Sequence, residues 1–213
     1  MPFIPLFFDW TWLILIPGLI LSIWAQVKVS STYKKYSKVP AQSGVSGAEF
    51  ARSMLRQNNV QGVTIQSIEG NMTDHFDPRN NTVSLSEGVF AGHSIAAVAI
   101  AAHECGHVLQ KATRYGPMKV RHRLAPVASV CSNLAFPLLL IGMFFSAMRI
   151  LIDIGAWVFF AVVIFQLVTL PVEFNASRRA LSNIETSGVL TATEQVEAKK
   201  VLSAAAMTYV AAT

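Results

Sequence analysis

The sequence predicts an α-helical integral membrane protein with a small polar domain of α+β structure. Apolar residues make up 53% of its 213 residues and charged residues only 14%, whereas soluble domains average about 25% charged. Three apolar stretches approach the roughly 20 residues needed to cross a bilayer. A longer segment with turn and strand patterns separates the first stretch from the other two. This composition excludes a disordered chain, a nucleic-acid-binding tail and a conventional soluble enzyme.

The first predicted transmembrane helix lies within residues 1–26, with its apolar stretch at 3–26. The alternative is a cleaved signal peptide, which carries a basic start and a shorter apolar core. No base precedes this stretch, and Trp10, Trp12 and Trp24 are typical of side chains that anchor a helix at the membrane surface. We therefore expect a retained helix.

The second and third predicted transmembrane helices occupy residues 127–170, as apolar stretches at 127–148 and 150–170 separated by Arg149. The alternative is a helical hairpin buried in a soluble core. Two adjacent stretches of this length are too much apolar surface for so small a chain to bury, which favours the membrane.

The positions of the bases predict the orientation. Of the 17 Lys and Arg residues, 12 lie in 27–126 and four in 171–213, and Arg149 is the remaining one. Both ends of the long segment 27–126 are basic, and basic flanks stay on the cytoplasmic side of a membrane. We expect the amino terminus outside and both 27–126 and 171–213 in the cytoplasm.

Within 27–126, local signals predict two helices and two strands. Ser46 and Glu49 form a capping box that opens a helix ending near Gln57. Residues 63–68 and 82–86 have strand character, and the cluster 77–81 is typical of a turn. Ser94 then caps a long apolar helix.

That last helix contains His103-Glu104-Cys105-Gly106-His107, an HExxH motif. Residues four apart lie on the same face of a helix, so both imidazoles can bind one zinc ion. Glu104 can act as the general base on the attacking water. Chance occurrence is the alternative, but burying a Glu and two His in an apolar helix is costly unless they have a partner such as a metal ion.

A catalytic zinc keeps one position open, so it needs one more protein ligand. Glu173 is the candidate, because two membrane crossings return it to the side of His107 and an unpartnered Glu at a membrane boundary is costly. The alternative is an ion pair of Glu173 with Arg178 or Arg179.

The chain resembles the YugP-like neutral zinc metallopeptidases, a family of bacterial membrane proteases, and more distantly the HtpX heat-shock and CAAX prenyl proteases. The resemblance covers nearly the whole chain. Its most specific segments are DPRNNTVSLSEGVF and VEFNASRRA, beside KKYSKVP, SGAEFAR, AAHECGHVLQ and AKKVLSAAAMTYVAA.

The resemblance implies a zincin-like metalloprotease domain of the gluzincin type, with His103, His107 and Glu173 as zinc ligands and Glu104 as general base. It also implies a substrate-binding edge strand, made of Thr82, Val83, Ser84, Leu85 and Ser86. Asn175 stands where an Asp is expected, and Cys105 replaces an aliphatic residue. The family continues past the apolar C-terminal helix, where a fourth span would lie.

Two functions follow as hypotheses. The first is a zinc endopeptidase in the bacterial cell membrane, acting on membrane-associated proteins or peptides at the cytoplasmic interface. The second is a zinc-binding scaffold or chaperone-like protein without turnover, and an intact Glu104 disfavours it. The expected partners are protein or peptide substrates and the lipid bilayer, and no nucleic-acid partner is expected. Whether the protein forms a homo-oligomer is left open by the sequence. The side chains considered for supporting roles at the site are His75, Asn175, Arg178 and Arg179.

Overall fold

The structure is a computed structural model that describes residues 11–213, and their side chains from residue 16 onward except that of residue 146. The predicted transmembrane stretch 3–26 therefore begins outside the described residues. In chain order the elements are α1 (Thr11–Tyr36), α2 (Gly47–Gln57), β1 (Thr64–Ile68), β2 (His75–Asp77), β3 (Thr82–Ser86), α3 (Glu87–Phe90), α4 (Ile95–Ala112), α5 (Gly116–Phe144), the 3₁₀ turn η1 (Ser146–Met148), α6 (Ile150–Ser187) and α7 (Ala192–Ala211).

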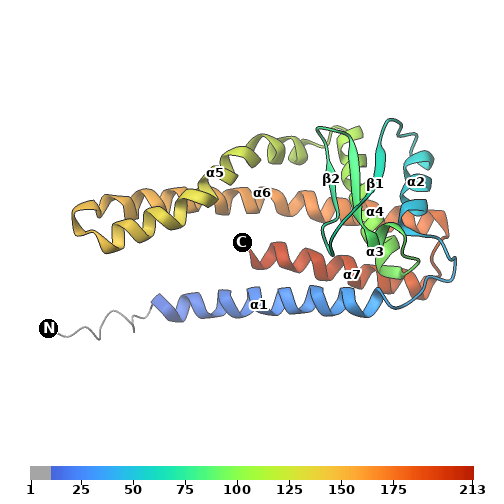
Figure 1. The fold of residues 1–213 in the computed structure, drawn as a ribbon, viewed down its shortest axis with the longest axis horizontal. Helices are drawn as coiled ribbons and strands as arrows, with labels where there is room; N and C mark the ends of the chain where they lie inside the picture. The colour runs from blue at the N-terminus through green and yellow to red at the C-terminus, as the bar shows by residue number, and fades with distance from the viewer. Residues whose placement is uncertain (1–10) are drawn as a thin grey trace.

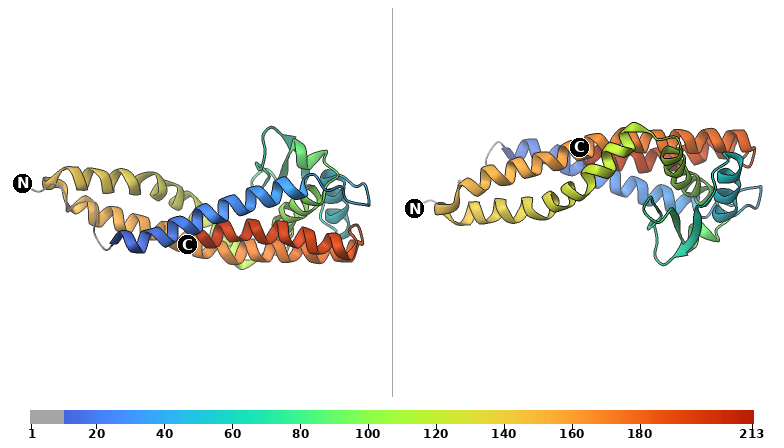
Figure 2. Two further views of the ribbon diagram at one scale, coloured as in Figure 1. Left: turned by 90° about the horizontal axis from the view of Figure 1, so that it is seen from below. Right: turned by 90° about the horizontal axis from the view of Figure 1, so that it is seen from above.

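The molecule is elongated, with two long helices at one end and the sheet at the other (Figure 1). Helices α5 and α6 form a hairpin that extends away from the sheet, and α1 lies alongside α7 in all three views (Figures 1 and 2). The second half of α6 returns to the sheet end, where it packs on α4.

The local signals in the sequence predicted α2, β1, β3 and α4, but not β2 or α3. Helix α2 begins with the predicted capping box between Ser46 and Glu49, and it ends at Gln57. Ser94 caps α4 by accepting a hydrogen bond from the backbone N–H of Ala97. These caps satisfy backbone groups that a helix leaves unpaired at its first turn, which is why they are readable in sequence.

The prediction that Thr82–Ser86 is an edge strand is wrong. The sheet has the order β1-β3-β2, so β3, made of Thr82, Val83, Ser84, Leu85 and Ser86, is the middle strand. It pairs in parallel with β1 and antiparallel with β2, and both of its hydrogen-bonding edges are occupied. Strand β2, from His75 to Asp77, is instead an edge strand.

Helices α5 and α6 are long and apolar enough to cross a membrane. Only 17% and 6% of their most apolar windows are buried, which argues against a hairpin buried in a soluble core. Helix α5 begins at Gly116, before the predicted start of the span, and α6 continues through Pro171 to Ser187, beyond the predicted end of the span. Of the helices in the described part of the chain, these two meet the length and apolarity test; a first and a fourth span stay predictions.

Helix α4 is the centre of the core and is contacted by α2, α6 and α7. The second half of α6 packs against it with small residues on one face, since Val172, Ala176 and Ala180 are all fully buried. The fit is close at Gly106, where a Cβ atom would lie 2.5 Å from the backbone oxygen of Ala176. Glycine is therefore required at this helix crossing, one residue before His107.

Candidate metal centre

Three side chains from two helices converge on one point. His103 and His107 lie on α4 and Glu173 lies on α6, and their ligand atoms all lie within 4.8 Å of one another. Glu173 Oε2 is 3.2 Å from His103 Nε2 and 3.5 Å from His107 Nε2. Ligands at 2.0–2.1 Å from a tetrahedral zinc ion are about 3.4 Å apart. The spacing of these atoms therefore fits one zinc ion.

The two helices deliver these side chains by simple geometry. His103 and His107 are one turn apart on α4, and their rings meet edge to face with centroids 4.9 Å apart. Glu173 reaches them because the small residues of α6 let the two helix backbones approach closely. The predicted pairing of the HExxH helix with Glu173 is therefore what the structure contains.

The carboxylate of Glu173 is buried, and its Oε1 atom lacks a hydrogen-bond partner among the described residues. Arg121 Nη2 lies 3.5 Å from Oε1, which is too long for a good hydrogen bond. A buried carboxylate oxygen without a partner is costly. A cation bound between Glu173 and the two histidines would remove much of that cost.

The electrostatic surroundings of His107 also favour a cation. Burial by itself would lower the pKa of its imidazole, but contact with Glu173 and the negative charges of Glu104 and Glu173 raise it. Two carboxylates thus surround the buried histidine pair. This donor set of two imidazoles and a carboxylate suits zinc.

Each histidine ring also has a polar contact at its Nδ1 atom. Gln110 donates from Nε2 to the backbone oxygen of Val172 at 2.7 Å, which leaves its Oε1 to accept from His107 Nδ1 at 3.0 Å. With Nδ1 engaged in this way, Nε2 is the nitrogen of His107 that faces Glu173 and could bind a metal ion. Ser177 Oγ lies 3.1 Å from His103 Nδ1 and can fix that ring in the same way. Such contacts orient metal-binding histidines.

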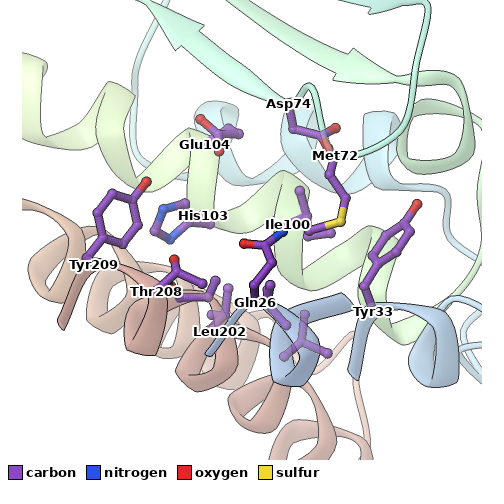
Figure 3. A pocket seen from close by; sticks show the side chains of 13 residues that line it. Gln26, Tyr33, Met72, Asp74, Ile100, His103, Glu104, Leu202, Thr208 and Tyr209 are labelled. Carbon is purple, nitrogen blue, oxygen red and sulfur yellow. The ribbon is translucent and has the colours of Figure 1, made fainter. Parts of the chain in front are cut away.

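Glu104 is the next residue after His103 and is 8% exposed. It lines a small cavity of about 120 Å³ together with His103, His107 and Glu173. It also lines a larger adjoining cavity (Figure 3). Glu104 thus lines the same small cavity as the three donor side chains.

Comparison with known proteins decides the family. Residues 11–213 match the family model described as "Putative neutral zinc metallopeptidase". The chain belongs to this zinc metallopeptidase family. A curated relative from Bacillus subtilis (strain 168), "Putative membrane protease YugP", is 48% identical over 197 residues, covering 92% of this chain and 87% of the relative. No solved structure matches the chain.

Among the supporting residues considered in this metallopeptidase, Asn175 reaches the site indirectly. Its Oδ1 accepts hydrogen bonds from Gln110 Nε2 at 3.1 Å and from Arg179 Nε at 2.8 Å. The Asp expected at this position could accept the same two bonds. Through Gln110, both Asn175 and Arg179 help to hold His107.

The other two supporting residues differ from each other. His75, on β2, lines the small cavity beside Glu104. Arg178 is exposed on α6 and does not line it. The alternative ion pair of Glu173 with Arg178 or Arg179 is absent from the described residues, because the guanidinium near Glu173 belongs to Arg121.

Four residues near the site were not predicted from sequence as part of it: Gln110, Ser177, Arg121 and Tyr209. Gln110 could have been found, since it follows His107 by three residues on an otherwise apolar helix face. Ser177 follows Glu173 by four residues and could have been found by the same rule. Cys105, which stands where the family resemblance leads us to expect an aliphatic residue, is fully buried near the backbone of Ala51.

Proposed function

We propose that the chain is a membrane-bound zinc-dependent endopeptidase that hydrolyses peptide bonds in membrane or membrane-proximal proteins at the cytoplasmic interface. The observation that supports this best is the convergence of His103, His107 and Glu173 beside Glu104, at a cavity that opens to the surface. A metal site with an adjacent carboxylate and an open approach is typical of hydrolytic zinc centres.

When bound, zinc polarises the scissile carbonyl and lowers the pKa of a water molecule toward 7. Glu104 accepts the proton of the attacking water and later delivers it to the leaving amine. Ser177 and Gln110 keep the two imidazoles oriented for metal binding. His75 and Tyr209 line the small cavity and are placed to donate a hydrogen bond to the carbonyl oxygen as its negative charge develops.

The substrate backbone would lie along β2. This strand has one edge paired with β3, and the other edge is available for an extended peptide. His75 and Phe76 of β2 line the cavity that holds the metal ligands. Addition of a peptide strand at such an edge is a common mode of recognition, and it would bring the scissile bond next to Glu104.

The proposed depth in the membrane follows from α6. Glu173 lies three residues after Leu170, the predicted end of the third span, so its Cα lies only about 5 Å beyond the boundary. The bases Lys119, Arg121 and Arg123 precede the second span and suit anionic lipid head groups there. The orientation is tested by cysteine labelling of Lys38→Cys: labelling from outside the cell would reverse it.

The function is tested with the full-length protein in detergent, incubated with unstructured casein with and without a metal chelator. We expect cleavage that the chelator stops and that added zinc restores. Glu104→Gln, which is nearly isosteric but cannot take up the proton, should keep zinc and lose at least about 100-fold in rate. If Glu104→Gln cleaves as well as the unmodified protein, the base lies elsewhere. If zinc-loaded protein cleaves nothing, the scaffold without turnover is the better reading.

A further inference from the structure

A second cavity opens directly beside the metal centre. It has a volume of about 310 Å³ and is walled by three helices, α1, α4 and α7, and by the loop before β2 (Figure 3). Ligand cavities in proteins begin at about 300 Å³. The space is therefore large enough for one bulky side chain and the peptide backbone that carries it.

The base of this cavity is aliphatic. Val29 of α1, Ile100 of α4, and Val201, Leu202 and Ala205 of α7 line it. Val29, Val201 and Leu202 are largely buried by packing among these helices, so the wall is formed by the fold itself. An apolar group that entered would leave water for an apolar surface, which is worth about 25 cal/mol per Å² buried.

One end of the cavity is catalytic. His103, Glu104 and Tyr209 line that end, Tyr33 lies toward the other, and Gln26 lies between them (Figure 3). A residue whose side chain entered the aliphatic part would keep its backbone beside Glu104. The cavity is thus positioned to bind the side chain of a residue next to the scissile bond.

The acidic groups of the cavity discriminate against charge. Asp74 accepts hydrogen bonds from the backbone N–H and the hydroxyl of Ser86, at 2.7 and 3.1 Å, so its carboxylate is already engaged. With Glu104 it repels an acidic side chain. A basic side chain would have to lose its hydration to enter the aliphatic part of the cavity, whereas an apolar side chain would not.

We propose that this cavity accepts a large apolar side chain of the substrate residue adjoining the scissile bond, and so sets the cleavage preference. The inference rests on the proposed endopeptidase function and names its substrate class. It also makes α1 part of the substrate site, because Val29 and Tyr33 help to form the cavity. Since α1 continues from the first predicted span, the cavity opens where a membrane-proximal apolar segment would arrive.

The test uses the full-length protein and a peptide mixture that varies one position among Gly, Ala, Leu, Phe, Lys and Glu, with cleavage sites mapped by mass spectrometry. We expect cleavage beside Leu or Phe to exceed cleavage beside Gly by about 10- to 200-fold in kcat/KM. Ala205→Phe fills the cavity and should remove this preference while Gly and Ala peptides are still cut. Ser203→Phe, on the exposed face of the same helix, is the matched control and should keep the preference.

Two further measurements keep the outcome decisive. Ile100→Ala enlarges the cavity and should shift the preference toward bulkier side chains, whether or not Ala205→Phe folds. Binding of a fluorescent Leu or Gly peptide to the Glu104→Gln protein should show the same preference without turnover.

Three results would overturn the inference while leaving the protease intact. They are cleavage without a side-chain preference, a preference for Lys, and a preference unchanged in Ala205→Phe and Ile100→Ala. A Leu-selective peptide affinity in a protein that cleaves nothing would support the cavity and contradict the proposed function. Competition by a fatty acid but not by Leu peptides would assign the cavity to an acyl chain instead.

Discussion

The two halves of helix α6 differ in how their apolar side chains are exposed. In residues 150–170 large apolar side chains are exposed, with Trp157 at 73% and Phe159 at 55%. In residues 171–187 one face of the helix packs against protein, where Val172, Ala176 and Ile184 are all fully buried, while Phe174 on another face is 45% exposed. One half leaves large apolar side chains exposed and the other packs against protein, although the helix is continuous from Ile150 to Ser187.

We propose that this difference joins a membrane anchor to the metal centre. Glu173 lies just inside the protein-packed half, close to where the exposed half ends. Because the helix does not break, the position of the lipid-facing half fixes the depth of the carboxylate. In the proposed membrane placement, the helix that supplies one ligand also holds the metal centre at the membrane surface.

The largest expected effect comes from removing that ligand. Glu173→Ala should reduce the zinc content of the purified protein to background and abolish cleavage, because only the two histidines of α4 would remain. Glu185→Ala, an exposed position on the same helix, is the matched control and should keep full zinc content. Zinc analysis by mass spectrometry checks both. Full occupancy in Glu173→Ala would exclude it as a ligand.

Truncating one isoleucine in each half sharpens the contrast in stability. Ile184→Ala removes a fully buried side chain and should lower the free energy of unfolding by about 2–5 kcal/mol. Ile150→Ala removes a side chain that is 68% exposed and should change it in detergent by no more than about 0.5 kcal/mol. Denaturant unfolding measures both. Equal losses would mean that the two halves are packed alike.

A single methyl group at the helix crossing should have the next effect. Gly106→Ala would push a Cβ atom against the backbone of Ala176, which must shift, at a cost of about 1–3 kcal/mol. The shift moves Glu173 away from the histidines, so zinc affinity should fall as well. Gly116→Ala, where the space around the added methyl group is open, should change neither quantity. Zinc titration and thermal unfolding test the pair, and an unaffected Gly106→Ala would show that α4 and α6 are less tightly packed.

The smallest effect is expected from removing the hydrogen bond that orients His107. Gln110→Ala removes the acceptor that holds His107 and should weaken zinc binding by about 10- to 100-fold. Gln57→Ala, an exposed glutamine at the end of α2, serves as the control. Competition with a zinc chelator gives the affinities. An unchanged affinity in Gln110→Ala would leave the orientation of His107 to packing alone.

What the sequence predicted well was local. Each of these features depends on residues close together in sequence, so each could be predicted directly. They are the helix caps at Ser46 and Ser94 and the spacing of His103 and His107. Glu173 was reachable because a zinc site with two histidines requires a third ligand and because the family resemblance pointed to the same residue.

What the sequence missed was non-local. The strand Thr82–Ser86 looks the same at an edge or in the middle of a sheet, and only its pairing with both β1 and β2 decides which it is. Arg121 and Tyr209 reach the metal centre from α5 and α7, far from the HExxH motif in sequence. The pattern of residues within one segment cannot predict a contact between segments that are far apart in sequence.

The central claim is that one zinc ion is bound jointly by α4 and the protein-packed half of α6. The most direct test is an anomalous difference map collected at the zinc edge from crystals of the full-length protein. The account predicts one peak, about 2.0–2.1 Å from His103 Nε2, His107 Nε2 and a carboxylate oxygen of Glu173. A zinc peak bound by the two histidines with Glu173 turned away, or a peak at another set of residues, would contradict it.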